Sequence, residues 1–340
     1  MKTKHVTKWF NWGFVLILSL SLLAGCVKKD NTGSAGLKIV RIGGIVLTEL
    51  GGNATITQKL GYFEEELKKV GYKPEYSAFA QAGPALNEAL SANAIDFGIY
   101  GDLPQLVLCD KGVNARAIAP ITTEQHYALL VHSNSGIRSV KDLEGKKVIG
   151  GTGTVLQKIF EDLVAAEGAD INKIHQLNAL ADARSVYASG EADAILSVLS
   201  SILINKEQSG GDVIFSTVNK PEWAAVIPLI GRGEFLDENP DAAKAIVRAL
   251  YRAYEYAAAD SAKAFEALTS ERLPIALVQA IYGYDPSFSY FKPEFTSEAI
   301  ARIEQTNDFL ARQKLIDNKV DLTKFLDTKY YDAVRGEFER

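Results

Sequence analysis

The chain has 340 residues, of which 47% are hydrophobic and 23% are charged, and its formal net charge is −5 at pH 7. This composition is typical of a globular protein that is long enough for two domains, so it argues against a disordered chain. The excess of acidic residues excludes a protein that binds nucleic acid or another polyanion.

The first 25 residues differ from the rest of the chain. Three lysines precede an apolar run at residues 14–23, which is too short to span a bilayer comfortably and has the pattern of a cleaved secretory signal. The run ends in the tetrapeptide "LAGC", which resembles the bacterial lipobox and implies cleavage before Cys26 and lipidation of its thiol. The alternative is an uncleaved membrane anchor with an incidental cysteine. Either reading places the body of the protein outside the cytoplasm.

Residues 26–36 are polar and rich in small side chains, so we expect a flexible tether between the lipid and the fold. Removal of the three leader lysines leaves 34 basic residues against 42 acidic ones, a formal net charge of −8. Cys109 then remains as the one free thiol of the folded body, which forbids an internal disulfide and predicts a small core residue.

The chain that follows the tether predicts alternating strands and helices. Residues 37–46 alternate apolar and polar side chains before becoming rich in glycine, as in a strand that enters a core. After a loop at 47–56, residues 58–71 place apolar side chains at helical spacing, with glutamates early and lysines late, as the helix dipole prefers. Further strands are expected at 72–80, 95–100 and 115–121, and further helices at 84–92 and 103–112.

The same alternation restarts near residue 140 and gives way to helices after residue 239. Two sets of alternating elements predict two α/β lobes, which extended segments near 127–132 and 224–230 would join. A cleft between such lobes is where a small ligand binds, next to the turns in which strands end and helices begin. In this half, strands are expected at 146–150, 174–180, 193–199 and 212–217, and helices at 140–145, 154–167, 181–189, 239–260, 261–268, 274–282 and 297–315.

One such turn, "GGTGT" at residues 150–154, has the chemistry of a small anion cradle. Glycines let the backbone approach a ligand, threonines offer hydroxyl groups, and the helix that follows points free amides outward. The turn lacks the ending of a Walker A loop, and Leu156 stands where a dinucleotide fingerprint needs its third glycine, so a nucleotide site is not expected. A tight turn in which Thr154 caps its own helix is the alternative.

Two turns in the first half have the same character, because each places a proline in the first turn of a helix. Gly83 suits close approach of the backbone to a ligand, and Tyr100 would form a wall that carries a hydroxyl group. Asp102 is more typical of a helix cap than of a ligand contact.

The loop at 47–56 offers further polar groups to the same cleft. Glu49 there would favour a ligand with a cationic part, such as a zwitterion, or would be a solvated loop residue. Asn53 lies in the same loop. Arg184 precedes an expected helix and could reach an oxyanion, although a surface position is the alternative.

Catalysis and metal binding find little support in the sequence. Neither metal-ligand spacing nor a carboxylate partner in sequence accompanies His126, His132 or His175. Cys109 lies on an expected helix, which indicates burial and not a nucleophile. We therefore expect no enzyme activity, no metal and no cofactor.

Four stretches in this order resemble one family: "GYFEEELKKVG", "AFAQAGPALNEALSANAIDFGIYGDLP", "SVKDLEGKKVIGGTGTVLQKIFEDLVAAEGAD" and "ARSVYASGEADAILS". The chain from about residue 38 to 330 looks like the substrate-binding component of ABC importers for aliphatic sulfonates, taurine, nitrate and thiamine precursors. The resemblance implies an α/β, two-lobed type II periplasmic-binding fold with an interlobe ligand cleft and two crossover segments. It implies one lobe from residues 37–127 and 228–340, and a second from 128–227.

The resemblance also implies the ligand-binding residues and the partners. The partners would be a small anionic or zwitterionic ligand, the transmembrane subunits of an ABC permease and, through the lipid on Cys26, the cell membrane, and the protein would be a monomer. One side of the cleft would hold Thr48, Gln81, Gly83, Tyr100 and Gly101, and the other Thr152, Gly153, Thr154 and Ser197.

One departure from the family affects the ligand. Relatives often carry a tryptophan and an acidic residue before proline just after the strand that matches "DAILSVLSS", whereas residues 197–201 here are small or aliphatic. The later stretch "SYFKPEFTSEAIARIEQTNDFLARQKLI" resembles the sulfonate-binding branch, so an aliphatic sulfonate is expected first. Taurine, nitrate and a thiamine-precursor pyrimidine are alternative ligands. A receptor-coupled sensor, or an enzyme on the same scaffold that uses His126, is an alternative function.

Overall fold

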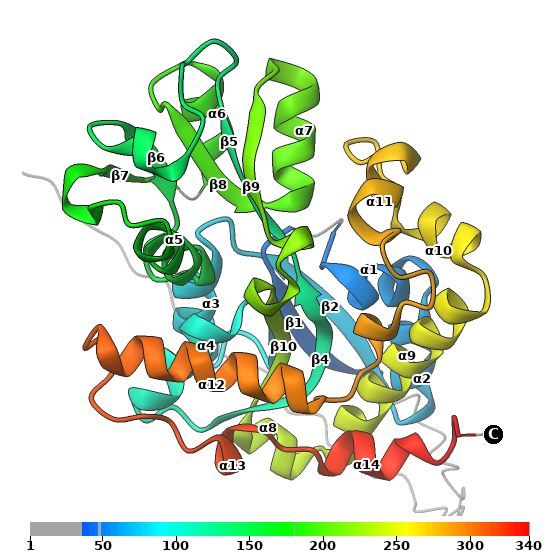
Figure 1. Cartoon of the computed structure of the whole chain (residues 1–340). Coiled ribbons are helices and arrows are strands. Elements are labelled where there is room, and N and C mark those ends of the chain that lie inside the picture. Colours follow the sequence, from blue (N-terminus) through cyan, green and yellow to red (C-terminus); the bar gives the residue numbers. More distant parts are fainter. Residues whose placement is uncertain (1–35, 47–48, 180, 340) are drawn as a thin grey trace, which may run out of the picture. The chain divides into compact units, whose positions relative to one another are not determined.

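The folded body contains two β-sheets flanked by helices (Figure 1). The computed structural model describes residues 36–46, 49–179 and 181–339, and the chain from Leu37 onward forms one compact unit. The leader, Cys26 and all but the last residue of the expected tether lie outside the described residues.

The first sheet has the strand order β2-β1-β3-β10-β4. Strand β1 runs parallel to β2 and β3, and β10 runs antiparallel to β3 and β4. Its strands are β1 (Lys38–Gly44), β2 (Tyr72–Ala78), β3 (Phe97–Ile99), β4 (Ala115–Gln125) and β10 (Ala225–Arg232).

The second sheet repeats this pattern in the order β7-β6-β8-β5-β9. Strand β6 is parallel to β7 and β8, and β5 is antiparallel to β8 and β9. Each sheet therefore combines four strands that point the same way with one antiparallel strand, β10 or β5, that the chain inserts as it crosses from the other sheet. The strands are β5 (Tyr127–Val131), β6 (Lys147–Gly150), β7 (His175–Asn178), β8 (Ala194–Val198) and β9 (Asp212–Ser216).

Helices fill the connections and the carboxyl-terminal third. The α-helices are α1 (Gly52–Lys59), α2 (Tyr62–Lys69), α3 (Ala82–Ser91), α4 (Asp102–Asp110), α5 (Val155–Ala166), α6 (Ala183–Ala188), α7 (Leu199–Ser209), α8 (Gly233–Glu238), α9 (Pro240–Ala259), α10 (Ser261–Leu268), α11 (Ile275–Tyr282), α12 (Ser297–Arg312), α13 (Leu322–Phe325) and α14 (Lys329–Arg335). Short 3-10 helices are η1 (Val140–Leu143), η2 (Ile171–Lys173), η3 (Thr217–Asn219), η4 (Pro221–Trp223) and η5 (Ser289–Phe291).

The predicted alternation of strands and helices is confirmed, but two local predictions were wrong. The helix expected at 58–71 is interrupted at Gly61, whose φ of 71° lies in the left-handed region, so it forms the end of α1 and all of α2. The loop expected at 47–56 ends early, because α1 begins at Gly52 after Gly51, which has a φ of 94°.

The two passages between the sheets are joined by a threonine hydroxyl group. The Tyr127 N–H, where the chain enters β5, donates to Thr217 Oγ1 at 3.0 Å, just after β9. The Nδ1 atom of His126 lies 3.1 Å from the same oxygen. Thr217 Oγ1 is therefore the shared partner of His126 Nδ1 and the Tyr127 N–H, and the histidine tautomer decides which atom of the His126–Thr217 pair donates.

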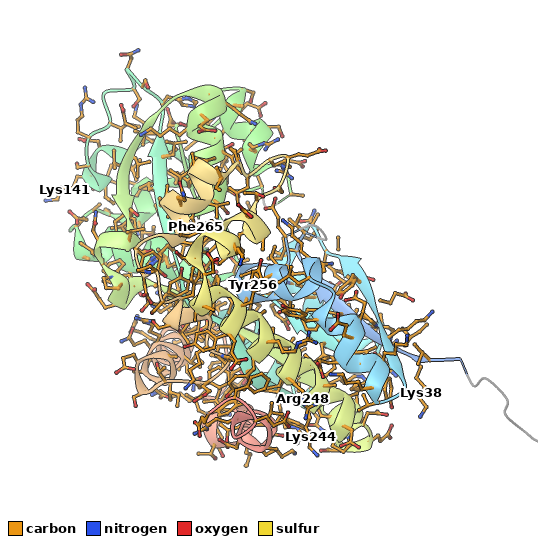
Figure 2. All side chains as sticks on the ribbon, turned by 90° about the vertical axis from the view of Figure 1, so that its right-hand side faces the viewer. Lys38, Lys141, Lys244, Arg248, Tyr256 and Phe265 are labelled. Carbon is orange, nitrogen blue, oxygen red and sulfur yellow. The ribbon has the colours of Figure 1, made fainter. Side chains whose placement is uncertain are left out.

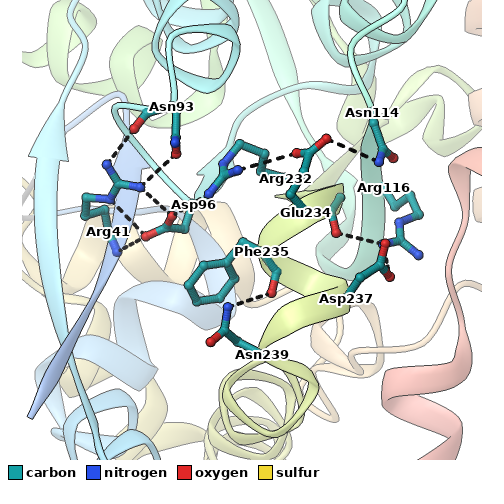
Figure 3. A network of polar contacts seen from close by, with 11 residues as sticks. Arg41, Asn93, Asp96, Asn114, Arg116, Arg232, Glu234, Phe235, Asp237 and Asn239 are labelled. Atoms are coloured by element: carbon teal, nitrogen blue, oxygen red, sulfur yellow. Dashed lines mark hydrogen bonds and ion pairs between the residues drawn. The ribbon is translucent and has the colours of Figure 1, made fainter.

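A polar network fastens the centre of the first sheet (Figure 3). The Asp96 side chain, 2% exposed, accepts from Arg41 Nε at 3.0 Å and from Arg41 Nη2 at 2.6 Å. Arg232 Nη2 lies 3.4 Å from the same carboxylate. Because Arg41 is on β1 and Arg232 on β10, one buried carboxylate between them connects strands from distant parts of the sequence.

The longest helix, α9, packs along α2. Arg252 Nη1 contacts the buried Glu66 Oε1 at 2.7 Å, and the Arg252 guanidinium lies 4.0 Å from the centre of the Tyr62 ring. Figure 2 shows α9 from the side, with Lys244 and Arg248 one turn apart near its beginning. Among the described residues, no helix combines the length and the apolar character that a membrane span needs.

Candidate ligand-binding site

The parallel strands of each sheet end together, and helices start just beyond those ends. Gly44 on β1 pairs with Ala78 on β2, and Gly43 pairs with Gly98 on β3. In the second sheet, Gly150 at the end of β6 pairs with Asn178 at the end of β7. The carboxyl edges of both sheets therefore present helix starts, which is the place where ligands bind in open α/β sheets.

Three of these helix starts meet one another. A Cβ atom placed on Gly153 would lie 3.7 Å from Pro84 Cγ, in the first turn of α3. One placed on Gly101 would lie 2.4 Å from Val155 Cγ2, so the start of α4 touches the start of α5. A Cβ on Gly83 would lie 2.4 Å from Pro104 Cγ, which joins α3 to α4. The starts of α3 and α4, which follow strands of the first sheet, thus lie next to the start of α5, which follows a strand of the second sheet.

The turn between β6 and α5 has both properties that the sequence suggests. Gly153 has a φ of 74°, a conformation that suits glycine. Thr154 also caps α5, because its Oγ1 accepts from the Leu156 N–H at 3.2 Å and its hydroxyl donates to the Gly151 carbonyl at 2.6 Å. The alternative, a tight turn in which Thr154 caps its own helix, is therefore confirmed, and the anion cradle stays a prediction.

A glutamine that the sequence reading missed binds the centre of this turn. The Gly153 N–H donates to Gln157 Oε1 at 2.9 Å, and Gln157 Nε2 donates to Glu161 Oε1 at 2.9 Å. Thr154-x-x-Gln157 is a capping-box pattern, which is a signal that could have indicated this side chain. Thr152 and Val155 donate no backbone hydrogen bond within the described part of the chain.

Tyr100 lies behind the helix starts and does not offer its hydroxyl group. Its side chain is 1% exposed, and the hydroxyl donates to Asn87 Oδ1 at 2.7 Å. Asn87 Nδ2 in turn donates to the Pro104 carbonyl at 2.7 Å. Tyr100 and Asn87 therefore hold α3 and α4 in position. We expected the Tyr100 hydroxyl group to face the ligand, but this side chain is buried and supports the two helices instead.

Asp102 is not the cap of α4, contrary to expectation. The N-cap is Gly101, and Asp102 is the first residue of the helix with no side-chain cap. Its side chain is 1% exposed, and neither carboxylate oxygen has a hydrogen-bond partner among the described residues. Burial raises the pKa of Asp102 to about 6, although nearby Thr306 and Lys158 lower it. A capping rule based on adjacent residues cannot detect this, because the burial comes from distant segments.

Of the other predicted contact residues, two lie at these helix starts, one lies near the end of β8, and one lies outside the described residues. Gln81 is the N-cap of α3 and is exposed, as is Thr152. Ser197 is half-buried near the end of β8, two residues beyond Ile195, the last β8 residue that pairs with β6. Thr48 lies outside the described residues.

Three polar residues considered from sequence are placed elsewhere or engaged. Glu49 is half-buried, and its Oε1 accepts from Ser270 Oγ at 2.7 Å. Asn53 is fully buried, and its Nδ2 donates to the carbonyls of Leu250 and Phe291. Arg184 is exposed on α6. Asn53 therefore serves the packing of α1 and not the ligand, because both of its bonds go to the surrounding backbone.

The histidines and the cysteine do not form a reactive centre. His126 is 3% exposed and its ring meets Tyr284 edge-on, with 4.8 Å between ring centres. Burial lowers the pKa of His126 and raises the pKa of the Cys109 thiol to about 12. No group of three or more His, Cys, Asp or Glu side chains suited to a metal ion occurs within the described ranges.

The model of the NMT1/THI5-like family matches residues 53–264, well over half of the chain. The chain belongs to this family.

Relatives of this NMT1/THI5-like protein include binding proteins and an enzyme. A Bacillus subtilis (strain 168) protein named for binding aliphatic sulfonates is 25% identical over 322 residues, 93% of this chain and 94% of the relative. A 4-amino-5-hydroxymethyl-2-methylpyrimidine phosphate synthase of Legionella pneumophila is 23% identical over 300 residues, 82% of this chain and 89% of the enzyme.

A solved structure confirms the fold. The periplasmic sulfonate-binding protein SsuA of Methylobacillus flagellatus KT has a TM-score of 0.72 and 26% identity, and the match covers 89% of this chain and 95% of that one. The NMT1/THI5-like chain therefore has the α/β, two-lobed periplasmic-binding fold.

Proposed function

We propose that the protein is an extracytoplasmic, lipid-anchored solute-binding protein that captures a small organic anion, an aliphatic sulfonate, between its lobes and delivers it to an ABC importer. The names of the Bacillus and Methylobacillus relatives support the sulfonate and the transport role. The lobes correspond to residues 37–127 with 228–340 and to residues 128–227 in this proposal.

The observation that carries the proposal is the contact between helix starts of different lobes. Gly153 approaches Pro84, and Gly101 approaches Val155, so the first turns of α3, α4 and α5 lie side by side. We infer that free backbone N–H groups of these turns face one region. Such groups bind an oxyanion without a charged side chain, because they are unpaired within the helix and the helix dipole adds positive potential. A sulfonate spreads its charge over three oxygens, which suits several separate amide donors.

The residues proposed to contact or frame the ligand keep distinct roles. Gly83 and Gly101 let the helix starts pack against Pro104 and Val155, and Gly153 leaves its backbone open to a ligand. Tyr100 supports the starts of α3 and α4 from behind. Gln81, Thr152 and Ser197 supply side chains at the edges. Thr48 and Thr154 complete the proposed set, the latter as the residue that fixes the turn.

The proposed cellular setting follows from the leader sequence. Cleavage before Cys26 and lipidation of its thiol would hold a monomer at the outer face of the cell membrane or in the periplasm, where the transmembrane subunits of an ABC permease are its partner. Mass spectrometry of the protein from the membrane fraction tests this, because the lipid adds mass to the Cys26 peptide. Cys26→Ser should release the protein from the membrane without changing its fold.

Isothermal titration of the mature protein with butanesulfonate, taurine, nitrate and the hydroxymethylpyrimidine tests the ligand. We expect heat of binding with butanesulfonate and weaker or no binding of the other three. Binding of none of these compounds would remove the solute proposal, while the family and the fold would stand. Mass spectrometry of small molecules that copurify with the protein gives an independent identification.

The Legionella synthase favours a second candidate, an enzyme on the same scaffold. Such an activity would need His126, the histidine nearest to the passages between the lobes. Its burial and its bond to Thr217 Oγ1 support a structural role instead. Turnover of a pyrimidine precursor that His126→Ala abolishes, at unchanged fold, would establish the enzyme.

A further inference from the structure

The side chain of Gln157 occupies the amide at the centre of the turn between β6 and α5. In an ordinary capping box the third residue of the helix binds the N–H of the N-cap residue. Here the Thr154 N–H bonds the Gly151 carbonyl at 3.0 Å, so it is unavailable to Gln157. Gln157 Oε1 reaches one residue further back and accepts from the Gly153 N–H at 2.9 Å.

This contact places a neutral acceptor on the amide that the proposed ligand would use. Gly153 is also the residue of this turn that approaches Pro84 of the other lobe. Any oxygen that binds the Gly153 N–H must therefore replace Gln157 Oε1. A charged oxyanion forms a stronger bond with an amide than a neutral carbonyl does, whereas an uncharged ligand oxygen has no such advantage over the glutamine.

The same glutamine is linked to the other lobe. Gln157 Nε2 donates to Glu161 Oε1 at 2.9 Å, and Gln313 Nε2 donates to Glu161 Oε2 at 2.8 Å. Gln313 is the C-cap of α12, which packs on α4 and β10 of the first lobe. The neighbouring residues on the two helices add a second contact, in which Arg312 Nη2 lies 3.4 Å from Asp162 Oδ1. Gly153, Gln157, Glu161 and Gln313 thus form a chain of hydrogen bonds from the turn through α5 to α12. Displacement of Gln157 from Gly153 would release this chain at the turn.

We propose that Gln157 is a specificity-determining residue that competes with the ligand for the Gly153 amide, so that only a charged oxyanion displaces it. This inference rests on the proposed function, because it needs an anion at the helix starts. The alternative is that Gln157 only caps α5. These two roles predict different affinities for charged and uncharged ligands. A competing Gln157 disfavours the uncharged ligand, whereas a residue that only caps α5 does not affect the preference.

The test compares butanesulfonate with butyl methyl sulfone, an uncharged analogue, by isothermal titration. Wild-type protein should bind the sulfonate and discriminate against the sulfone. Gln157→Ala frees the Gly153 amide, so we expect the affinity for the sulfone to rise about threefold to tenfold and the affinity for the sulfonate to rise less. The ratio of the two affinities should therefore become smaller than in the wild type. Gln157→Glu places a carboxylate on the amide, and we expect it to weaken sulfonate binding by about tenfold or more.

Gln313→Ala is the matched control, because it removes the far end of the chain and leaves Gln157 on Gly153. The Gln313→Ala variant should prefer butanesulfonate over butyl methyl sulfone as strongly as the wild type does. Circular dichroism verifies the fold of each variant, and the NMR signal of the Gly153 amide should move on sulfonate addition in the wild type. Unchanged discrimination in Gln157→Ala, or loss of sulfonate binding there, overturns the inference. A wild type that binds neither probe overturns the proposed function itself.

Discussion

The Gly101 backbone and the Val155 side chain touch across the two lobes with no space for another atom. A Cβ atom on Gly101 would lie 2.4 Å from Val155 Cγ2, which is closer than real side chains approach. Gly101 itself has a φ of −61° and a ψ of 153°, which any residue adopts. Glycine is therefore required here for space and not for backbone conformation.

Gly101→Ala should push the starts of α4 and α5 apart. Overpacking of this kind costs about 1–3 kcal/mol, so we expect butanesulfonate to bind about tenfold or more weakly. Small-angle X-ray scattering should show a larger radius of gyration. Adding Val155→Ala removes the opposing methyl groups and should restore much of the affinity. If the double variant binds butanesulfonate no more tightly than Gly101→Ala alone, the added methyl group acts through something other than the contact with Val155.

Gly153→Ala should weaken both the fold and ligand binding. The φ of 74° costs a non-glycine residue about 1–2 kcal/mol. Gly168→Ala is the matched control, since Gly168 has a φ of 68° just after α5 and also has space for a methyl group, with Lys141 Cε the nearest atom at 3.9 Å. Urea unfolding should detect a similar loss in both variants, whereas titration with butanesulfonate should detect a loss of affinity for Gly153→Ala alone.

Thr154→Ala removes a cap that also fixes the turn. Loss of an N-cap hydroxyl costs about 1 kcal/mol of stability. Thr296 caps α12 in the same way, through Oγ1 and the Ala299 N–H at 3.1 Å, far from the helix starts. We expect Thr296→Ala to lower the free energy of unfolding by a similar amount and to leave butanesulfonate binding unchanged, whereas Thr154→Ala should lower both. Equal affinity of the two variants would place the ligand elsewhere.

Asp102 should make the protein less stable as the pH rises through about 6. Burial raises the pKa of this carboxyl from 3.8 to about 6 in the folded protein, so the folded state holds its proton more tightly than the unfolded chain. The corresponding stability is present below pH 4 and is lost above pH 6, by about 3 kcal/mol at most. Asp102→Asn should therefore be more stable than wild type in urea at pH 7.5, and the difference should shrink at pH 4.

Asp142 provides a control whose pKa is shifted in the opposite direction, so its contribution to stability should depend on pH in the opposite sense. It accepts hydrogen bonds from the Arg138 and Ser139 N–H groups, which lower the pKa of its carboxyl. Asp142→Asn should lose stability at pH 7.5 relative to wild type and not at low pH. A pH-independent difference for Asp102→Asn would contradict the role of its buried charge.

The sequence predicts the β-α-β order and the place of the helix starts, because strand and helix periodicity and the prolines and glycines at the turns are local signals. It does not predict contacts made by distant segments. Asp102 resembles a cap in sequence, yet residues far along the chain bury it. Asn53 resembles a loop residue, yet α9 and η5 surround it with backbone acceptors. The break at Gly61 was missed because the apolar spacing continues across it.

The hydroxyl group of Thr217 has a consequence for how the protein moves. It accepts from Tyr127 on one passage between the sheets, faces His126 there, and belongs to the other passage. Bending of one passage alone would pull this oxygen away from its partners, whereas bending of both together keeps them. We therefore expect the two passages to bend together when the protein changes shape.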